Sequence, residues 1–160
     1  MRKVWPDLRA RDVMRTDVVT ISETASLADA VQALIDNRIT GMPVTDEAGQ
    51  LSGVISVRDI LDHLTQNPAR LTGRRAFYAA GPTDEEEDWE LGELEVPEEE
   101  VATVSDVMTA EIHAVDVETR LQEIASKMVE HRIHRVLVTQ KKKYVGLVSA
   151  MDVLNALVRR

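Results

Sequence analysis

The chain has 160 residues, of which 44% are apolar and 29% charged, as in an ordinary globular protein. It has no cysteine, which excludes disulfides, thiolate metal sites and cysteine nucleophiles. No apolar run approaches a membrane span, and no apolar stretch of a signal peptide follows the basic residues near Met1, so we expect a cytoplasmic protein without a membrane partner. The net charge of −9 argues against nucleic acid as a partner, because phosphate binding needs clustered lysine and arginine.

One pattern of residues occurs twice along the chain. When the sequence is shifted by 94 positions, Asp12-Val13-Met14 falls on Asp106-Val107-Met108. A one-residue deletion in a turn changes the shift to 93 for the end of the repeat, where Leu61 falls on Leu154. The two shifts together align twelve identical pairs in order. Such a repeat predicts two copies of one structural unit. The expected boundaries are residues 8–65 for repeat 1, 66–101 for an acidic linker and 102–158 for repeat 2.

Each repeat is expected to have the element order β-α-β-β-α after an opening helical turn. Apolar residues of the first helix recur at the spacing that buries one helix face. Ser26 with Asp29 has the form of an N-terminal capping box, and so has Thr119 with Gln122. Repeat 1 is expected to have a turn at 8–14, a strand at 18–21, a helix from 26, strands at 42–45 and 51–56, and a helix from 56. The expected elements of repeat 2 are a turn at 104–108, a strand at 113–115, a helix from 119, strands at 136–139 and 144–149, and a helix from 149.

The linker between the repeats carries the acidity of the chain. Residues 84–100 contain eleven acidic residues and no basic one, whereas the remainder has seventeen acidic and nineteen basic residues. This composition favours a solvated flexible tether. The alternative is a segment that docks on the body of the protein or on a partner, because acidic tethers rarely contain aromatic residues. The aromatic residues in the linker are Phe77, Tyr78 and Trp89.

Each repeat ends in the pattern Gly-hydrophobic-hydrophobic-Ser-x-x-Asp-hydrophobic-Leu, at residues 53–61 and 146–154. Two such copies resemble the cystathionine-β-synthase (CBS) domain pair, or Bateman module. The segment Ile133–Val138 is also similar to the corresponding segment in the gamma subunit of the AMP-activated protein kinase. The resemblance implies an α/β fold of two tandem repeats with pseudo-two-fold symmetry. It further implies a stand-alone regulatory module, usually a homodimer, that binds adenosine-type ligands in clefts between its halves.

The aspartates of this pattern, Asp59 and Asp152, are the first candidate site residues. A carboxylate accepts several hydrogen bonds, which suits two ribose hydroxyls, and the resemblance implies this role. The residues alone favour a structural role, because Ser56 with Asp59 and Ser149 with Asp152 are also capping boxes. The two roles are compatible. Ser56 and Ser149 lie at the same helix starts, where unpaired backbone N–H groups can also hold phosphate.

His134 and Arg135 are the candidates for binding phosphate. Successive strand residues point to opposite faces, so the residues alone are equally well explained as a strand-edge histidine and a solvated arginine. In the kinase gamma subunit the matching pair binds nucleotide phosphates, and the ribose aspartate comes from the other repeat. The resemblance therefore implies one cleft formed by His134, Arg135, Asp59, Ser56 and Arg58. The second cleft, formed by Asp152, Ser149 and Thr20, is expected to lack this phosphate grip because repeat 1 has Thr40-Gly41 there.

Other chemistry has little support in the sequence. His131 and His134 have a spacing that binds metals on helices, but the repeat alignment places His134 beyond the helix, so we expect no metal site. The motifs of nucleophilic, phosphate-loop and zinc-protease enzymes are missing, so we expect no catalytic residues and no enzyme. We expect a module that senses AMP, ADP or ATP, with S-adenosylmethionine as a further candidate, and regulates an unknown effector protein. The alternative is a ligand-free module that dimerises or scaffolds a protein partner.

Overall fold

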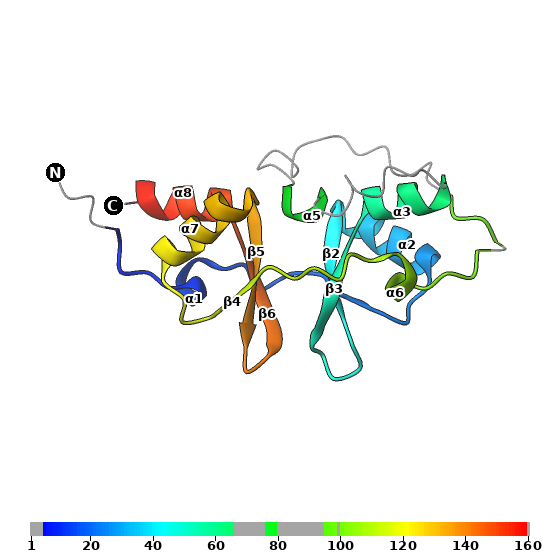
Figure 1. Ribbon diagram of the computed structural model, residues 1–160, viewed down its shortest axis with the longest axis horizontal. Helices are drawn as coiled ribbons and strands as arrows, with labels where there is room; N and C mark the ends of the chain where they lie inside the picture. Colours follow the sequence, from blue (N-terminus) through cyan, green and yellow to red (C-terminus); the bar gives the residue numbers. More distant parts are fainter. Residues whose placement is uncertain (1–4, 66–75, 80–94, 99, 160) are drawn as a thin grey trace. The chain divides into compact units, whose positions relative to one another are not determined.

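The computed structural model describes residues 5–65, 76–79, 95–98 and 100–159 (Figure 1). These residues form two compact units, and each unit contains one three-stranded sheet. We name the units after the candidate aspartates that they contain. The Asp59 unit consists of described residues 19–65, 76–77, 95–98 and 100–112, and the Asp152 unit of 5–18, 78–79 and 113–159.

The Asp59 unit packs helices against a mixed sheet. Its elements are β1 (Ile21–Ser22), α2 (Leu27–Asn37), β2 (Gly41–Thr45), β3 (Leu51–Ser56), α3 (Val57–Leu64) and α6 (Val104–Val107). Strand β2 lies in the middle, parallel to β1 and antiparallel to β3. The core forms where α2 and α3 lie beside this sheet, and its fully buried members include Leu34, Met42 and Ile60. This burial stabilises the start of α3, where Asp59 lies.

The Asp152 unit repeats this arrangement. Its elements are α1 (Ala10–Val13), β4 (Ala114–Asp116), α7 (Leu121–His131), β5 (Arg135–Gln140), β6 (Lys143–Ser149) and α8 (Ala150–Val158). Strand β5 lies between a parallel β4 and an antiparallel β6. Even the irregularities match, because β2 and β5 each shift register before the threonine near their end, at Thr45 and Thr139. The predicted α/β class with two β-α-β-β-α repeats is therefore confirmed, whereas the pseudo-two-fold symmetry between them stays a prediction.

Each unit contains the opening segment of the other repeat, which the sequence did not predict. In the Asp59 unit, Thr109 exchanges two backbone hydrogen bonds with Val54 of β3, at 2.8 and 2.9 Å. In the Asp152 unit, Arg15 exchanges two with Leu147 of β6, at 2.9 and 3.0 Å. Glycine makes room for both pairings, since a Cβ at Gly53 would lie 2.5 Å from the Thr109 carbonyl oxygen. The exchange brings Thr109 beside α3 and Arg15 beside α8.

The helix starts test the predicted capping boxes. Ser26 forms one with Asp29, as predicted, and α3 and α8 begin with serine capping boxes as well. The prediction for Thr119 was wrong, because α7 has Arg120 as its N-cap residue and no side-chain cap. Instead, the Leu121 N–H at the start of α7 donates to the Leu8 carbonyl at 2.8 Å, so a tertiary contact replaces the local cap.

Strand ends and turns differ slightly from expectation. Strand β1 begins later than predicted, at Ile21, and is shorter, whereas β4 has the predicted length but begins one residue later, at Ala114. The β5–β6 hairpin is tighter than predicted and turns through Lys141 and Lys142, both with positive φ. Two positive φ angles suit the right-handed twist of the strands that a two-residue turn connects.

The described part of the linker packs on the two units. In the short helix α5 (Ala76–Ala79), Phe77 and Tyr78 are 3% and 0% exposed, so the docking alternative holds for these aromatics. Val96 packs against the core of the Asp59 unit, and Oε2 of Glu100 lies 3.2 Å from Nε2 of His63. Trp89 and residues 84–94 lie outside the described residues, so the tether stays a prediction there. None of the helices in the described ranges has the length and hydropathy that crossing a bilayer requires.

Candidate functional site

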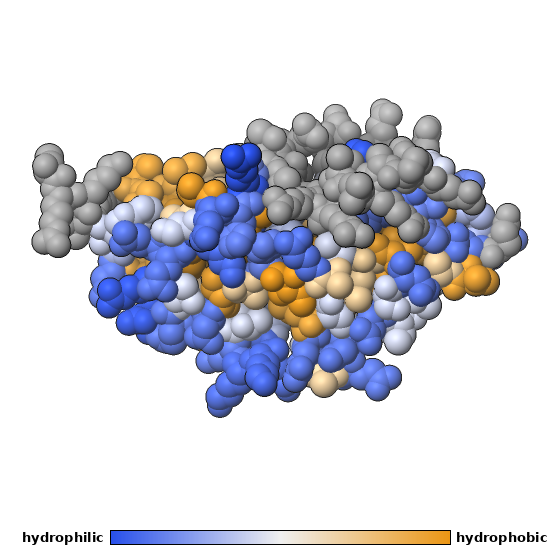
Figure 2. Space-filling view, in the orientation of Figure 1, coloured by the Kyte–Doolittle hydropathy of each residue, from blue (hydrophilic) through white to orange (hydrophobic). Residues whose placement is uncertain are grey.

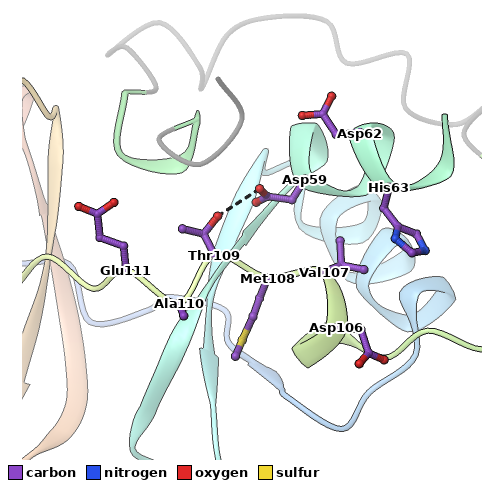
Figure 3. Close-up of a pocket in the computed structure, with 9 residues that line it drawn as sticks. All are labelled: Asp59, Asp62, His63, Asp106, Val107, Met108, Thr109, Ala110 and Glu111. Carbon is purple, nitrogen blue, oxygen red and sulfur yellow. Dashed lines mark hydrogen bonds between the residues drawn. The ribbon is translucent and has the colours of Figure 1, made fainter. Parts of the chain in front are cut away.

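A pocket of about 440 Å³ lies in the Asp59 unit, between α3 and the segment that contains α6 (Figure 3). Four of its nine lining residues are acidic, and none is lysine or arginine. The lining residues are Asp59, Asp62, His63, Asp106, Val107, Met108, Thr109, Ala110 and Glu111. The pocket therefore presents carboxylates and hydroxyl or backbone groups to a ligand.

Asp59 is held by hydrogen bonds on both carboxylate oxygens. Its Oδ2 accepts from the backbone N–H of Ser56 at 2.8 Å and from the Ser56 hydroxyl at 2.9 Å. Its Oδ1 accepts from the Thr109 hydroxyl at 3.2 Å, across to the exchanged segment (Figure 3). A carboxylate accepts about four hydrogen bonds, so roughly one position on Oδ1 is left for a ligand. This geometry fixes the carboxylate before any ligand arrives.

The carboxyl groups in and beside this pocket differ in the direction of their pKa shifts. Burial raises the pKa of Asp59, the hydrogen bonds from Ser56 and Thr109 oppose the rise, and the nearby Asp62 adds to it. In contrast, the Thr103 backbone N–H and hydroxyl donate to Asp106 and lower the pKa of that carboxyl. The backbone N–H of Ala102 likewise lowers the pKa of Glu100, with a smaller contribution from His63.

Asp62 is the most buried acidic side chain of the pocket, with 5% of the residue exposed. Its Oδ1 accepts from Nε of Arg58 at 3.1 Å, one helical turn earlier on α3. Its Oδ2 has no hydrogen-bond partner in the part of the chain that the structure describes. Arg58, a candidate for binding phosphate, is thus engaged by a carboxylate of its own helix.

Asp152 has the same local geometry at the start of α8. Its Oδ2 accepts from the Ser149 backbone N–H and hydroxyl, both at 2.8 Å. Its Oδ1 lies 3.4 Å from Nε of Arg15, which comes from the exchanged segment of this unit. Under the 94-residue shift, Arg15 corresponds to Thr109. The Oδ1 atom of each aspartate therefore faces the same position of the exchanged segment. This position holds the neutral Thr109 beside Asp59 and the cationic Arg15 beside Asp152.

The remaining candidates lie at the strand ends. His134 follows the end of α7, as predicted, and its backbone N–H donates to the Tyr78 carbonyl at 2.6 Å. Arg135 begins β5 directly opposite Ser149 of β6. Thr20 is exposed and directly precedes β1. In the described residues, no three acidic or histidine side chains are arranged to hold a metal ion.

The two predicted clefts combine residues of different units. One joins Asp59 to His134 and Arg135, and the other joins Asp152 to Thr20. Both combinations stay predictions. The repeat does not mark Thr109 or Arg15, because these equivalent positions carry different residues in the two copies. The signal that would have found them is their place directly after the repeated Met108 and Met14.

Comparison with known proteins identifies the repeats. The CBS domain model matches residues 10–66 and 104–159. The AMP-activated protein kinase subunit gamma-3 of Sus scrofa is 30% identical over 143 residues, which cover 89% of this chain and 24% of that protein. The chain thus spans about a quarter of that relative's length. Hypoxic response protein 1 of Mycobacterium tuberculosis is 26% identical over 148 residues, which cover 92% of this chain and 84% of that protein.

Solved structures show the same fold. CBSX2 in complex with AMP has a TM-score of 0.66 and 22% identity, and the match covers 95% of this chain and 97% of that one. Other CBS structures of this fold were solved in complex with ATP or with S-adenosylmethionine. Because the family model matches well over half of the residues, in two copies, this chain belongs to the CBS domain family and carries a CBS domain pair.

Proposed function

We propose that this chain is a regulatory module that binds an adenosine-type ligand and passes the signal to an effector protein. The candidate ligands are AMP, ADP, ATP and S-adenosylmethionine. The observation that carries the proposal is the pair of aspartates at the starts of α3 and α8, each fixed by its capping serine and with Oδ1 directed away from that cap. Relatives of the same fold bind AMP, ATP or S-adenosylmethionine, and CBS pairs are typically non-catalytic.

The ribose is the part of these ligands that suits the aspartates. Its two adjacent hydroxyls are hydrogen-bond donors, and the acceptor position left on Oδ1 of each fixed carboxylate is a strong acceptor for one of them. Because the capping serine already orients the carboxylate, binding costs little further side-chain entropy. The same hydrogen bonds hold Asp59 and Asp152 in place at the helix start. In this proposal the capping role and the binding role therefore reinforce each other.

The residues proposed to contact a ligand's phosphate lie at the ends of strands or are arginines. Arg135 lies opposite Ser149 in the β5–β6 ladder, which favours a place at the same edge as the start of α8. His134, Arg58 and Thr20 remain proposed contacts. The proposal also includes that the chain forms a homodimer in the cytoplasm and binds no metal, membrane or nucleic acid.

A ligand-free dimerisation or scaffold module is the second candidate. It is favoured by the exposed apolar side chains of α7 and α8 in the Asp152 unit. Figure 2 shows hydrophobic surface over α8, where Leu154 and Val158 are 54% and 81% exposed. On α7, Val129 is 79% exposed. Apolar surface of this kind suits contact with another protein, and it needs no nucleotide.

Thermal denaturation with each of the four ligands tests the proposal. A ligand at about 100 times its Kd stabilises the folded chain by about 2.7 kcal/mol. For a chain of this length, that raises the unfolding midpoint by roughly 5–11 °C. The control is 2′,3′-dideoxyadenosine, which lacks both ribose hydroxyls and should leave the midpoint unchanged where adenosine raises it. If none of the four ligands moves the midpoint at millimolar concentration, the scaffold candidate replaces the sensor.

A further inference from the structure

In each unit the middle strand begins at a corner that it shares with the aspartate helix. In the Asp59 unit, the Val57 N–H at the start of α3 donates to the Thr40 carbonyl at 2.8 Å, directly before β2. In the other unit, the Ala150 N–H at the start of α8 donates to the His134 carbonyl at 2.7 Å, directly before β5. The 94-residue shift makes these two places equivalent. We call them the strand corners, and they are Thr40 with Gly41 and His134 with Arg135.

Phe77 of α5 occupies the strand corner of the Asp59 unit. The helix lies beside the start of β2 (Figure 1), and an added Cβ at Gly41 would be 2.7 Å from the ring carbon Cδ2 of Phe77. Gly41 is paired directly with Ser56, the residue that caps α3 and holds Asp59. Gly41 and Phe77 are both buried, so no open space is left between them. A ligand group that enters this corner has to move the ring.

Tyr78 of α5 occupies the equivalent corner of the Asp152 unit. Its carbonyl accepts from the His134 N–H at 2.6 Å, and its hydroxyl accepts from the His113 N–H at 3.0 Å. Its ring meets the His113 ring edge-on, with 4.8 Å between the ring centroids. Tyr78 is fully buried. These contacts anchor α5 at the start of β5.

The anchor conflicts with a phosphate at the start of β5, where the proposed function places it. A phosphate oxygen and the Tyr78 carbonyl oxygen are both acceptors, whereas the His134 backbone offers one N–H, which the carbonyl already takes. Two acceptors that are brought together without a second donor repel each other, and a buried acceptor without a donor is costly. Adenosine carries no phosphate and does not meet this conflict.

We propose that a nucleotide phosphate and α5 compete for the start of β5, so that binding of AMP, ADP or ATP releases α5. The docked helix is then an autoinhibitory contact within the chain. Its release exposes Phe77 and Tyr78, and aromatic side chains are the kind that protein partners recognise. An adenosine-type ligand without phosphate leaves α5 docked. This inference rests on the proposed function, because it takes His134 and Arg135 as the phosphate contacts.

Amide hydrogen exchange of the full chain, measured by NMR with AMP or adenosine, tests the release. The reporter is the His113 N–H, because its acceptor is the Tyr78 hydroxyl and it is not a proposed phosphate contact. The control is the Leu137 N–H, which donates to the His113 carbonyl at 2.9 Å. With saturating AMP the His113 amide should exchange at least about 10-fold faster, because its protecting contact is lost. Adenosine should change neither amide. Unchanged exchange of the His113 amide with bound AMP would overturn the inference.

Variants of α5 should bind AMP more tightly, because less free energy is needed to displace the helix. Phe77→Ala removes a buried ring, which corresponds to a gain in AMP affinity of up to roughly 10- to 150-fold in calorimetric titration. Tyr78→Phe is milder and should also tighten AMP binding, since it removes only the acceptor of the His113 N–H. Adenosine affinity should change by less than about 2-fold in both variants, because a ligand that does not displace α5 gains nothing from its loss.

Val31→Ala is the control for a general loss of stability. Val31 belongs to the core around α2, so this variant should unfold at a lower temperature than the wild type without binding AMP more tightly. Weaker AMP binding in Phe77→Ala or Tyr78→Phe would make α5 a part of the binding site and would overturn the inference. If the wild type binds AMP but neither variant changes its affinity, the competition alone is refuted. If neither the wild type nor Tyr78→Phe binds any of the four ligands, the proposed function has failed, and the inference with it.

Discussion

Gly53→Ala tests whether the exchanged segment positions the Asp59 site. Gly53 lies in β3 directly before Val54, which pairs with Thr109 of the exchanged segment. A Cβ at this position would lie 2.5 Å from the Thr109 carbonyl oxygen and 3.0 Å from the Met108 sulfur. The first contact is with backbone, so the segment itself must move away. Thr109 then moves with it, and its hydroxyl leaves Asp59.

The size of the effect follows from what the movement breaks. Two backbone hydrogen bonds join Val54 and Thr109, at 2.9 and 2.8 Å, and each contributes about 1 kcal/mol net. Overpacking of a buried contact costs about 1–3 kcal/mol, which overlaps with the loss of these bonds. We therefore expect Gly53→Ala to lower the free energy of unfolding by about 2–4 kcal/mol. For a chain of this length the unfolding midpoint falls by roughly 4–16 °C.

Thermal denaturation followed by circular dichroism measures this change. The control is Gly49→Asn, since Gly49 has a φ of +76° and nothing within 4 Å of an added Cβ. Asparagine tolerates this conformation, so the control should shift the midpoint much less. The variant should also bind adenosine more weakly, because Thr109 no longer holds Asp59. A Gly53→Ala variant as stable as Gly49→Asn would refute the close packing of this segment on β3.

Three further predictions concern single hydrogen-bonded groups. The pKa of Asp106 is lowered in the folded chain, so its carboxylate stabilises the fold at pH values above 3.8, and this stabilisation is lost as the pH falls through the folded pKa. Asp106→Asn should therefore be less stable than wild type at pH 7, with the difference closing in acid. The pKa of Asp59 is raised, so ionisation of this carboxyl lowers the free energy of unfolding as the pH rises from 3.8 through the folded pKa. Asp59→Asn should gain stability relative to wild type across that pH range, and the opposite trend in pH-dependent denaturation would contradict the burial of Asp59. Tyr78→Phe leaves the buried backbone N–H of His113 without its acceptor at 3.0 Å and should cost about 1–3 kcal/mol in chemical denaturation, whereas an unchanged midpoint would argue against docking of α5.

The local patterns of the sequence predict the elements and their caps well. Ser56 with Asp59 and Ser149 with Asp152 are capping boxes in the sequence and in the structure, because a cap depends on residues three apart. Thr119 shows where this reasoning fails. A distant carbonyl, that of Leu8, satisfies the first N–H of α7, so the local cap does not form.

The neighbours of the two aspartates could not be predicted in this way. Thr109 reaches Asp59 and Arg15 reaches Asp152 only because each opening segment pairs with the last strand of the other repeat. That pairing spans 50 or more positions along the chain, and its local trace is a glycine, at Gly53 or Gly146, where a side chain would collide with the segment. Both glycines are part of the repeated motif, but the need for glycine follows only from the contact with the backbone of Thr109 or Arg15.

Titration of adenosine into the double variant Asp59→Asn with Asp152→Asn tests the central claim most directly. Each substitution keeps a side chain of the same shape that can still accept from the capping serine, so the chain should unfold cooperatively as the wild type does. If the two aspartates bind ribose, the wild type gives a saturable heat of binding and the double variant gives none. Adenosine binding of wild-type affinity in a folded double variant would contradict the account.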